Sequence, residues 1–319
     1  MLSLSEIENA AAIVYAAMPP TAQYSWPLLA KRTGCEVWVK HENHTPIGAF
    51  KVRGGLVYMD RLKRRDPALK GIASATRGNH GQSIALAAAR VGVAATIVVP
   101  QGNSVEKNAA MRAFGAELIE AGHDFDAARE AAVRLANERG LTMVPSFHRD
   151  LVAGASSYAL ELFRAAPPLD TVYVPIGLGS GLCGVISARD ALGLTTKVVG
   201  VVSAAAPAYA LSFAAKKVVA TNSADTMADG MAVRGPDAEA LAVILKGADR
   251  IVQVSDDEVM GAMRAYYTDT HQISEGAGAA SLAALTQERE RMKGRKVGLI
   301  LSGGNIDKHV YLRALGAGA

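Results

Sequence analysis

The sequence predicts an α/β protein in which helices cover parallel β-sheets. Short apolar runs rich in β-branched residues alternate with longer segments of helical periodicity along most of the chain. The runs are apolar on both faces, as expected for strands that lie between two layers of helices. Repeated strand–helix alternation indicates parallel pairing, because each helix returns the chain to the edge where the previous strand began.

Nine runs are predicted strands, because each is short, rich in β-branched residues and bounded by turn-forming residues. They span residues 36–40, 71–75, 94–99, 117–119, 142–144, 171–174, 197–202, 250–254 and 296–301. Eight segments show helical periodicity, near residues 50–64, 80–91, 105–114, 124–138, 153–164, 182–192, 256–267 and 276–288. One of these helices opens with Ser255-Asp256-Asp257-Glu258, the pattern of a capping box.

The composition argues against several classes of partner. Half of the 319 residues are hydrophobic, but no apolar stretch has the length of a membrane span, so we expect no membrane partner. The basic run 61–65 lacks interleaved aromatic residues and ends a predicted helix, which argues against nucleic-acid binding. The two cysteines, Cys35 and Cys183, form no C-x-x-C pattern, which favours a reducing, cytoplasmic compartment.

A glycine-bearing turn, Gly177-Leu178-Gly179-Ser180-Gly181, follows one predicted strand and opens a helix. Glycines let backbone N–H groups approach an anion, and a helix N-terminus favours negative charge. The turn therefore predicts a phosphate cradle, with a simple packing turn as the alternative. A dinucleotide fold would need an acidic residue at the end of the next strand, but Ser203 stands there.

Two further turns place polar groups at strand ends. Thr76-Arg77-Gly78-Asn79-His80 offers hydroxyl, guanidinium, amide and backbone donors, a combination that suits a carboxylate ligand. Taken alone, this segment is equally well explained as an N-cap turn made by Thr76 or Asn79. Ser302-Gly303-Gly304-Asn305 puts a hydroxyl at the tip of a strand, where an ordinary strand-end turn is the alternative.

Lys51 differs from an ordinary surface lysine because apolar Ala49, Phe50 and Val52 flank it. Apolar surroundings lower the pKa of an amine and make it nucleophilic, which is the state that forms an imine with an aldehyde cofactor. The P-loop and G-x-S-x-G patterns are absent, and the histidines do not cluster at the spacings of zinc ligands. Lys51 is therefore the candidate for covalent chemistry.

Together these segments resemble fold-type II enzymes that depend on pyridoxal 5′-phosphate (PLP), in particular their threonine/serine dehydratase branch. The resemblance covers almost the whole chain, in order. The matching segments are 49–54 with S-F-K-x-R-G, 76–80 with S-S/A-G-N-H, 177–180 with a run of four glycines, 226–230 with T-x-A-D-G, 275–280 with E-P-x-G-A-A and 302–305 with S-G-G-N.

This resemblance implies a fold like that of the tryptophan synthase β subunit, with two parallel-sheet α/β domains. A small mobile domain would span residues 47–146, and a large cofactor-binding domain would combine residues 1–46 with 147–319. We also expect a homodimer. Some family members bind a mono- or divalent cation near the T-x-A-D-G segment, and the sequence does not assign its ligands. Biosynthetic threonine dehydratases add a C-terminal regulatory domain, and residues 306–319 are too few for one, so we expect no allosteric control of that kind.

The resemblance also assigns roles to individual residues. Lys51 would carry PLP and act as general base, Asn79 would contact the oxygen of the cofactor ring, and Ser302 would contact its nitrogen. A hydroxyl partner makes the ring a weaker electron sink, which suits β-elimination. The implied cofactor-binding residues are Phe50, Lys51, Asn79, Gly177, Leu178, Gly179, Ser180, Gly181, Glu275 and Ser302. The implied substrate-binding residues are Thr76, Arg77, Gly78, Asn79 and His80.

The function implied by the resemblance is that of a carbon–oxygen lyase, similar to threonine/serine dehydratases, which converts a 3-hydroxy-amino acid to a 2-oxo acid and ammonia. Arg77 replaces a small residue of the family, and Gly154-Ala155-Ser156-Ser157 replaces G-Q-G-T. These departures leave open a dehydratase for hydroxyaspartate, phenylserine or an intermediate of hydroxyectoine breakdown.

Two other activities, and a role without catalysis, would use the same cofactor. An amino-acid racemase of the serine-racemase type would need a second base, but arginine, a poor base, stands where family racemases have serine. A synthase is disfavoured because the S-G-G-N ending is typical of dehydratases. A PLP-binding protein without catalytic activity is disfavoured because Lys51, Asn79 and Ser302 are intact.

Overall fold

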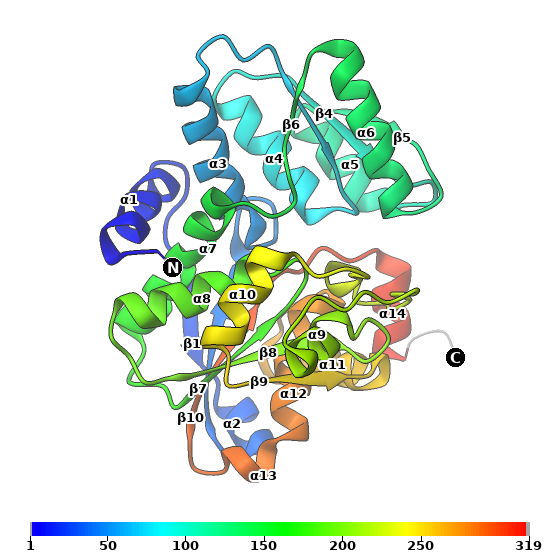
Figure 1. The fold of residues 1–319 in the computed structure, drawn as a ribbon. Helices are drawn as coiled ribbons and strands as arrows, with labels where there is room; N and C mark the ends of the chain where they lie inside the picture. The colour runs from blue at the N-terminus through cyan, green and yellow to red at the C-terminus, as the bar shows by residue number, and fades with distance from the viewer. Residues whose placement is uncertain (1, 317–319) are drawn as a thin grey trace.

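The chain folds into two β-sheets flanked by helices, in a computed structural model that describes residues 2–316 (Figure 1). The larger sheet has six strands in the order β1-β2-β10-β7-β8-β9, and the smaller sheet has four in the order β5-β4-β3-β6. Each pair of neighbouring strands is parallel except β1 with β2. The predicted α/β class with parallel sheets is confirmed.

The nine predicted strands are present, and their ends differ from the prediction by one residue at most. The strands are β1 (Gln23–Ser25), β2 (Glu36–His41), β3 (Ile72–Ala75), β4 (Ala95–Val99), β5 (Glu117–Glu120), β6 (Thr142–Met143), β7 (Thr171–Pro175), β8 (Lys197–Ser203), β9 (Arg250–Val254) and β10 (Lys296–Leu301). Strand β1 was not predicted, because its three residues contain no apolar β-branched side chain.

The eight predicted helices are also present. The helices are α1 (Leu4–Tyr15), α2 (Pro27–Thr33), α3 (Lys51–Arg65), α4 (Asn79–Arg90), α5 (Val105–Ala113), α6 (Phe125–Arg139), α7 (Arg149–Ala165), α8 (Ser180–Ala191), α9 (Ala208–Ala215), α10 (Ala238–Gly247), α11 (Asp256–Thr270), α12 (Gly276–Gln287), α13 (Arg289–Met292) and α14 (Lys308–Leu315), with short 3-10 helices η1 (Glu42–His44) and η2 (Asp229–Met231). The capping box predicted at Ser255 and Glu258 is formed. Among residues 2–316, none of the helices combines the length and apolar character that crossing a bilayer requires.

The larger sheet brings together strands from both ends of the chain. Strand β10 lies between β2 and β7, so three segments that are far apart in the sequence end at the same edge. The chain after β2 returns to this edge, where Ala49 forms a β-bridge with Gly303, just beyond β10. In open α/β sheets this carboxyl edge is where ligands bind.

The smaller sheet is built from β3 to β6, within residues 72–143. These strands fall inside the predicted small domain, residues 47–146, but the domain limits and the mobility of this part stay predictions. Helix α3 packs against α4 beside the smaller sheet and against α7 beside the larger one. The helix that begins at Lys51 therefore contacts both halves of the molecule.

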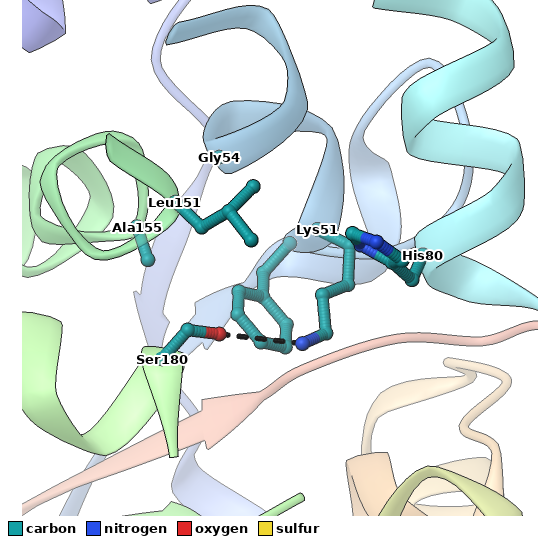
Figure 2. Close-up of a pocket in the computed structure, with 7 residues that line it drawn as sticks. Lys51, Gly54, His80, Leu151, Ala155 and Ser180 are labelled. Carbon is teal, nitrogen blue, oxygen red and sulfur yellow. Dashed lines mark hydrogen bonds between the residues drawn. The ribbon is translucent and has the colours of Figure 1, made fainter. Parts of the chain in front are cut away.

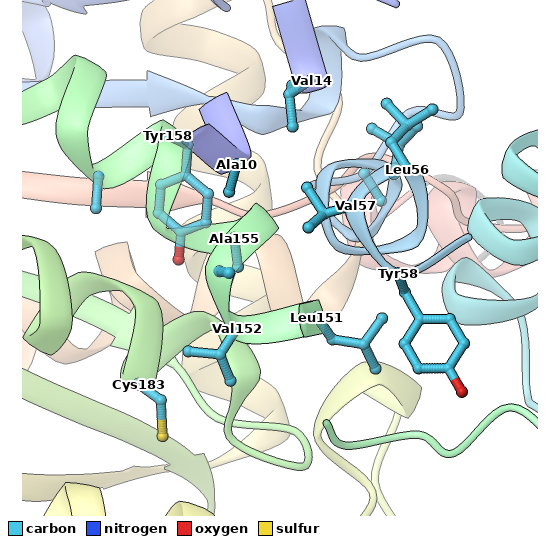
Figure 3. Close-up of a cluster of buried hydrophobic side chains, with 14 of the residues drawn as sticks. Ala10, Val14, Leu56, Val57, Tyr58, Leu151, Val152, Ala155, Tyr158 and Cys183 are labelled. Atoms are coloured by element: carbon cyan, nitrogen blue, oxygen red, sulfur yellow. The ribbon is translucent and has the colours of Figure 1, made fainter. Parts of the chain in front are cut away.

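Helix α3 is fixed by an apolar core that it shares with α1, α7 and α8 (Figure 3). Val14 of α1, Val57 of α3 and Tyr158 of α7 are among its buried members. Burying one large apolar side chain contributes about 1.5–3 kcal/mol, so many such contacts hold the start of α3 in place. A second cluster lies on the opposite face of the larger sheet, under α2, α11 and α12.

Candidate active site

Lys51 lies in a small cavity where α3, α4, α7 and α8 meet. The cavity is lined by Phe50, Lys51, Gly54, His80, Leu151, Ala155 and Ser180. Figure 2 shows the Lys51 side chain extending toward Ser180, with His80 on one side and Leu151 and Ala155 across the cavity. Apolar side chains therefore form much of the surroundings of the amine.

The Lys51 amine has few polar neighbours. Its Nζ donates a hydrogen bond to Ser180 Oγ at 3.2 Å and lies 5.1 Å from the centre of the Phe50 ring. Loss of water lowers the pKa of this amine from 10.5 to about 8, and no carboxylate of residues 2–316 opposes that effect. Part of the Lys51 population is therefore neutral and nucleophilic at neutral pH.

A buried ionic network holds the first turn of α3. The guanidinium of Arg53 contacts Glu42 at 2.7 Å and Glu161 at 2.6 Å, and all of these groups are buried or nearly so. Lys40 of β2 adds a second cation, 2.6 Å from Glu161. Because the charges come from β2, η1, α3 and α7, the network fixes Lys51, two residues before Arg53, against the larger sheet.

The glycine-bearing turn lies at the start of α8, as predicted. At Gly177 an added Cβ would lie 2.5 Å from the Gly230 carbonyl oxygen, and at Gly181 it would lie 3.3 Å from the Phe50 ring. A side chain at Gly177 would collide with this carbonyl, and one at Gly181 would press against Phe50, so the turn packs closely on its neighbours. The first N–H groups of a helix have no partner within the helix, so this turn can bind an anion.

The turn at residues 76–80 combines a structural role with candidate ligand groups. Thr76 Oγ1 accepts hydrogen bonds from the N–H groups of Gly78 at 2.9 Å and Gly81 at 3.2 Å. Thr76 therefore closes the turn. Its O–H group remains able to donate a hydrogen bond to a substrate. Arg77 is exposed on the same turn.

His80 is buried in the cavity wall beside Lys51. Its Nε2 has no hydrogen-bond partner among the residues that the structure describes. Burial, assisted by the charge of Lys51, lowers the pKa of His80 to about 3, so the imidazole is neutral at physiological pH. A neutral ring nitrogen with no partner is available to a ligand.

The amide of Asn79 is oriented from both ends. Its Nδ2 donates to Glu275 Oε1 at 2.7 Å, and its Oδ1 accepts from Asn305 Nδ2 at 2.9 Å. Glu275 precedes α12 and Asn305 follows β10, so two segments of the larger half fix a residue at the start of α4. One N–H of the Asn79 amide remains free to bind a ligand.

Lys107 of α5 joins this network, although the sequence analysis did not identify it. Its Nζ lies 2.5 Å from Asp229 and 3.4 Å from Glu275. Burial raises the pKa of Glu275 to about 7, against the opposing effect of the Lys107 charge. Gly78 leaves space for this lysine, since an added Cβ would lie 2.3 Å from Lys107 Cδ.

A signal for Lys107 was present in the sequence. A lysine in the first turn of a predicted helix faces the positive end of the helix dipole, which disfavours it unless carboxylates lie nearby. Glu275 was predicted to bind the cofactor, and the structure places its carboxylate on Asn79 and Lys107. Ser302, the predicted partner of the ring nitrogen, is buried, and its carbonyl accepts the Phe50 N–H at 2.9 Å.

This chain is similar to known proteins in both sequence and fold. A family model described as "Pyridoxal-phosphate dependent enzyme" matches residues 15–303. The L-threonine ammonia-lyase of Thermotoga maritima is 32% identical over 319 residues, which cover 100% of this chain and 79% of that protein. The L-threo-3-hydroxyaspartate ammonia-lyase of Saccharomyces cerevisiae is 33% identical over 285 residues, which cover 89% of this chain and 87% of that protein. A solved pyridoxal 5′-phosphate-dependent aspartate racemase superposes with a TM-score of 0.91 at 28% identity, over 97% of each chain.

Proposed function

Because the chain belongs to the family of pyridoxal-phosphate dependent enzymes, we propose that it is an ammonia-lyase acting on a 3-hydroxy-amino acid. The products are a 2-oxo acid and ammonia. The β-carbon–oxygen bond breaks first, as in the predicted carbon–oxygen lyase, and the carbon–nitrogen bond breaks afterwards. The proposal rests on the surroundings of the Lys51 amine. This amine lies in a cavity beside the glycine-bearing start of α8, and its pKa is lowered.

The residues of the cavity fit PLP. The cofactor carries an aldehyde, which an amine such as Lys51 can bind covalently, and a phosphate, which suits the start of α8. Gly177, Gly179 and Gly181 give this turn a backbone with few side chains, as a phosphate cradle requires. The unpartnered Nε2 of His80 is the kind of buried polar atom that a ligand satisfies.

We propose the following residues as contacts of the bound cofactor. Residues 177–181 would bind the phosphate, the free N–H of Asn79 would face the ring oxygen, and Ser302 would face the ring nitrogen. Phe50 lies beside the Lys51 amine and would pack against the cofactor. Glu275 would act through Asn79, since its carboxylate accepts the hydrogen bond that orients this amide.

When bound, PLP supplies an electron sink that stabilises negative charge on the α-carbon of the substrate. The turn at residues 76–80 would hold the substrate carboxylate through backbone N–H groups and the Thr76 hydroxyl. Lys51 Nζ would take the α-proton, which its lowered pKa allows near neutral pH. Leu151 and Ala155 line the cavity on its apolar side.

Arg77 favours a second candidate substrate. L-threonine and L-threo-3-hydroxyaspartate are both named among the substrates of similar lyases. An exposed guanidinium on the substrate-binding turn can pair with a second carboxylate, which hydroxyaspartate has and threonine lacks. Racemisation is less favoured, despite the structural likeness to an aspartate racemase, because arginine is a poor second base.

We also propose that the enzyme is a cytoplasmic homodimer. Cys35 and Cys183 are both buried free thiols, which supports a reducing compartment. The predicted mono- or divalent cation has no support from side-chain clustering, since within residues 2–316 no three His, Cys, Asp or Glu side chains are grouped as a metal site requires.

The test is an assay of the purified chain with PLP. We expect a coloured protein that releases 2-oxo acid and ammonia in equal amounts from L-threonine, L-serine or L-threo-3-hydroxyaspartate, with chiral chromatography detecting any racemisation. Lys51→Ala should abolish both the visible absorption of bound cofactor and turnover, because the covalent attachment and the base are lost together. The exposed Lys246→Ala serves as control. Full activity in Lys51→Ala would refute the assignment.

A further inference from the structure

The turn before α8 has one position at which a polar side chain enters the cavity. An added Cβ would lie 2.5 Å from the Gly230 carbonyl oxygen at Gly177 and 2.7 Å from Ala240 at Gly179, and it would be tightly packed against Phe50 at Gly181. Ser180, between two of these glycines, is buried and lines the cavity (Figure 2). The sequence thus places a hydroxyl where the related enzymes have a fourth glycine.

The Ser180 hydroxyl does not cap its own helix. Serine at the start of a helix usually accepts a hydrogen bond from a backbone N–H two or three residues later. Here the N-cap residue is Gly179, which has no side chain, and Ser180 is the first residue of the helix. The hydrogen bond that Ser180 Oγ makes is with Lys51 Nζ at 3.2 Å, so its contact is with the candidate site.

The other neighbours of the Lys51 amine do little to stabilise its positive charge. His80 of α4 is neutral, Leu151 and Ala155 of α7 are apolar, and the start of α8 is the positive end of that helix dipole. The Phe50 ring, 5.1 Å away, supplies only a weak cation–π attraction. Among the residues that line this cavity, the Ser180 hydroxyl is therefore the hydrogen-bond acceptor that stabilises the protonated amine.

We infer that Ser180 is a positioning residue, whose hydroxyl holds the Lys51 amine beside the reacting carbon and stabilises its protonated form. This inference rests on the proposed function. In each turnover the α-carbon–hydrogen bond breaks, a new N–H bond forms on Lys51 Nζ, and the resulting ammonium stays hydrogen-bonded to Ser180 Oγ. Without this acceptor the amine would be less basic and free to take other rotamers.

The first test uses the full chain freed of PLP, with its fold checked by circular dichroism. Lys51 is labelled with acetic anhydride across a pH series, and the labelled peptide is quantified by mass spectrometry. Ser180→Ala should lower the pH midpoint of labelling by about one unit, because a hydrogen bond to a charged group is lost. Ser180→Thr keeps a hydroxyl and should retain the wild-type midpoint. An unchanged midpoint in Ser180→Ala would overturn the inference.

The second test separates positioning from phosphate binding. In the holoenzyme, Ser180→Ala should lower kcat roughly 10-fold or more, since a misplaced base affects the chemical step, and should change KM little. Weaker PLP binding with an unchanged labelling midpoint would assign Ser180 to the phosphate and refute the positioning role. Labelling needs no turnover, so a chain without lyase activity would refute the proposed function and still give a result here.

Discussion

Lys107 is a buried cation that affects both the protonation of Glu275 and the orientation of the Asn79 amide. Its ammonium lies between Glu275, which is buried, and Asp229, which is partly exposed, two carboxylates that would otherwise repel each other. Glu275 in turn orients Asn79 through a 2.7 Å hydrogen bond. The charge on α5 therefore controls the orientation of an amide at the start of α4.

Replacing Lys107 by methionine should destabilise the protein by about 3–5 kcal/mol at neutral pH, because a buried carboxylate loses its partner. The pKa of Glu275, already raised to about 7 against an ordinary 4.5, should rise further. A folded-state pKa above the unfolded one means that stability falls as pH rises through this window. The deficit should therefore grow from pH 5 to pH 8, as urea unfolding would measure.

Lys107→Arg is the matched control, since it keeps the charge and should keep most of the stability. A deficit in Lys107→Met that is the same at pH 5 and pH 8 would contradict the role assigned to Glu275.

At the scale of elements, the site depends on where helices begin. Helices α3, α4 and α8 start at residues that face one cavity, and each follows a turn with glycine or small side chains. Gly179 shows the requirement most clearly, since its φ of 102° lies in the left-handed region and an added Cβ would collide with Ala240 of α10. A side chain there would be strained and would also displace α8.

Gly179→Ala should lower the free energy of unfolding by roughly 2–4 kcal/mol and weaken PLP binding, because the left-handed cost and a clash with Ala240 add together. Gly193→Ala is the control. Gly193 also has a positive φ, 65°, but there is open space where a Cβ would lie. Gly193→Ala should therefore lower the free energy of unfolding by only about 1–2 kcal/mol and leave PLP binding unchanged. Equal losses in the two variants would show that packing against α10 is unimportant.

At the scale of the whole molecule, side chains from the two halves meet around the site. Ser104, at the start of α5, donates to Asp307 at the start of α14 at 2.5 Å, and the Lys308 N–H donates to Glu106 at 2.9 Å. On another side Arg234 pairs with Asp126. These contacts hold the smaller sheet against the larger one in the present arrangement.

Asp307→Ala should weaken substrate binding if the small domain moves as the family resemblance implies. Loss of the Ser104 contact would make the closed arrangement less populated, so KM should rise about 3- to 10-fold with little change in kcat. Hydrogen exchange should speed up in α5 and stay unchanged in the strands of both sheets. The control is Glu290→Ala, which changes an exposed side chain of α13. An unaltered KM in Asp307→Ala would argue against such closure.

The local pattern of this chain was sufficient for nine of its strands, most of its helices and the turns of the candidate site. Apolar runs, helical periodicity and glycine-bearing turns are properties of neighbouring residues, so they can be recognised without knowing the fold. Strand β1 and helices α2, α9, α10, α13 and α14 were not predicted, and all of them except α10 have eight residues or fewer. Strand β1 forms because β2 offers a free edge beside Gln23–Ser25, and that edge exists only in the folded chain.

Only the tertiary structure decided which residues of the candidate site lie in contact with one another. The insertion of β10 between β2 and β7 brings Ser302 to Phe50, a contact between residues far apart in the chain. The same folding brings Lys107 to Glu275 and Ser180 to Lys51. The sequence by itself determined the fold class, the likeness to PLP enzymes and the candidate lysine, because these follow from local residue pattern. The pKa of that lysine and its hydroxyl partner arise from packing between distant segments, which no local pattern contains.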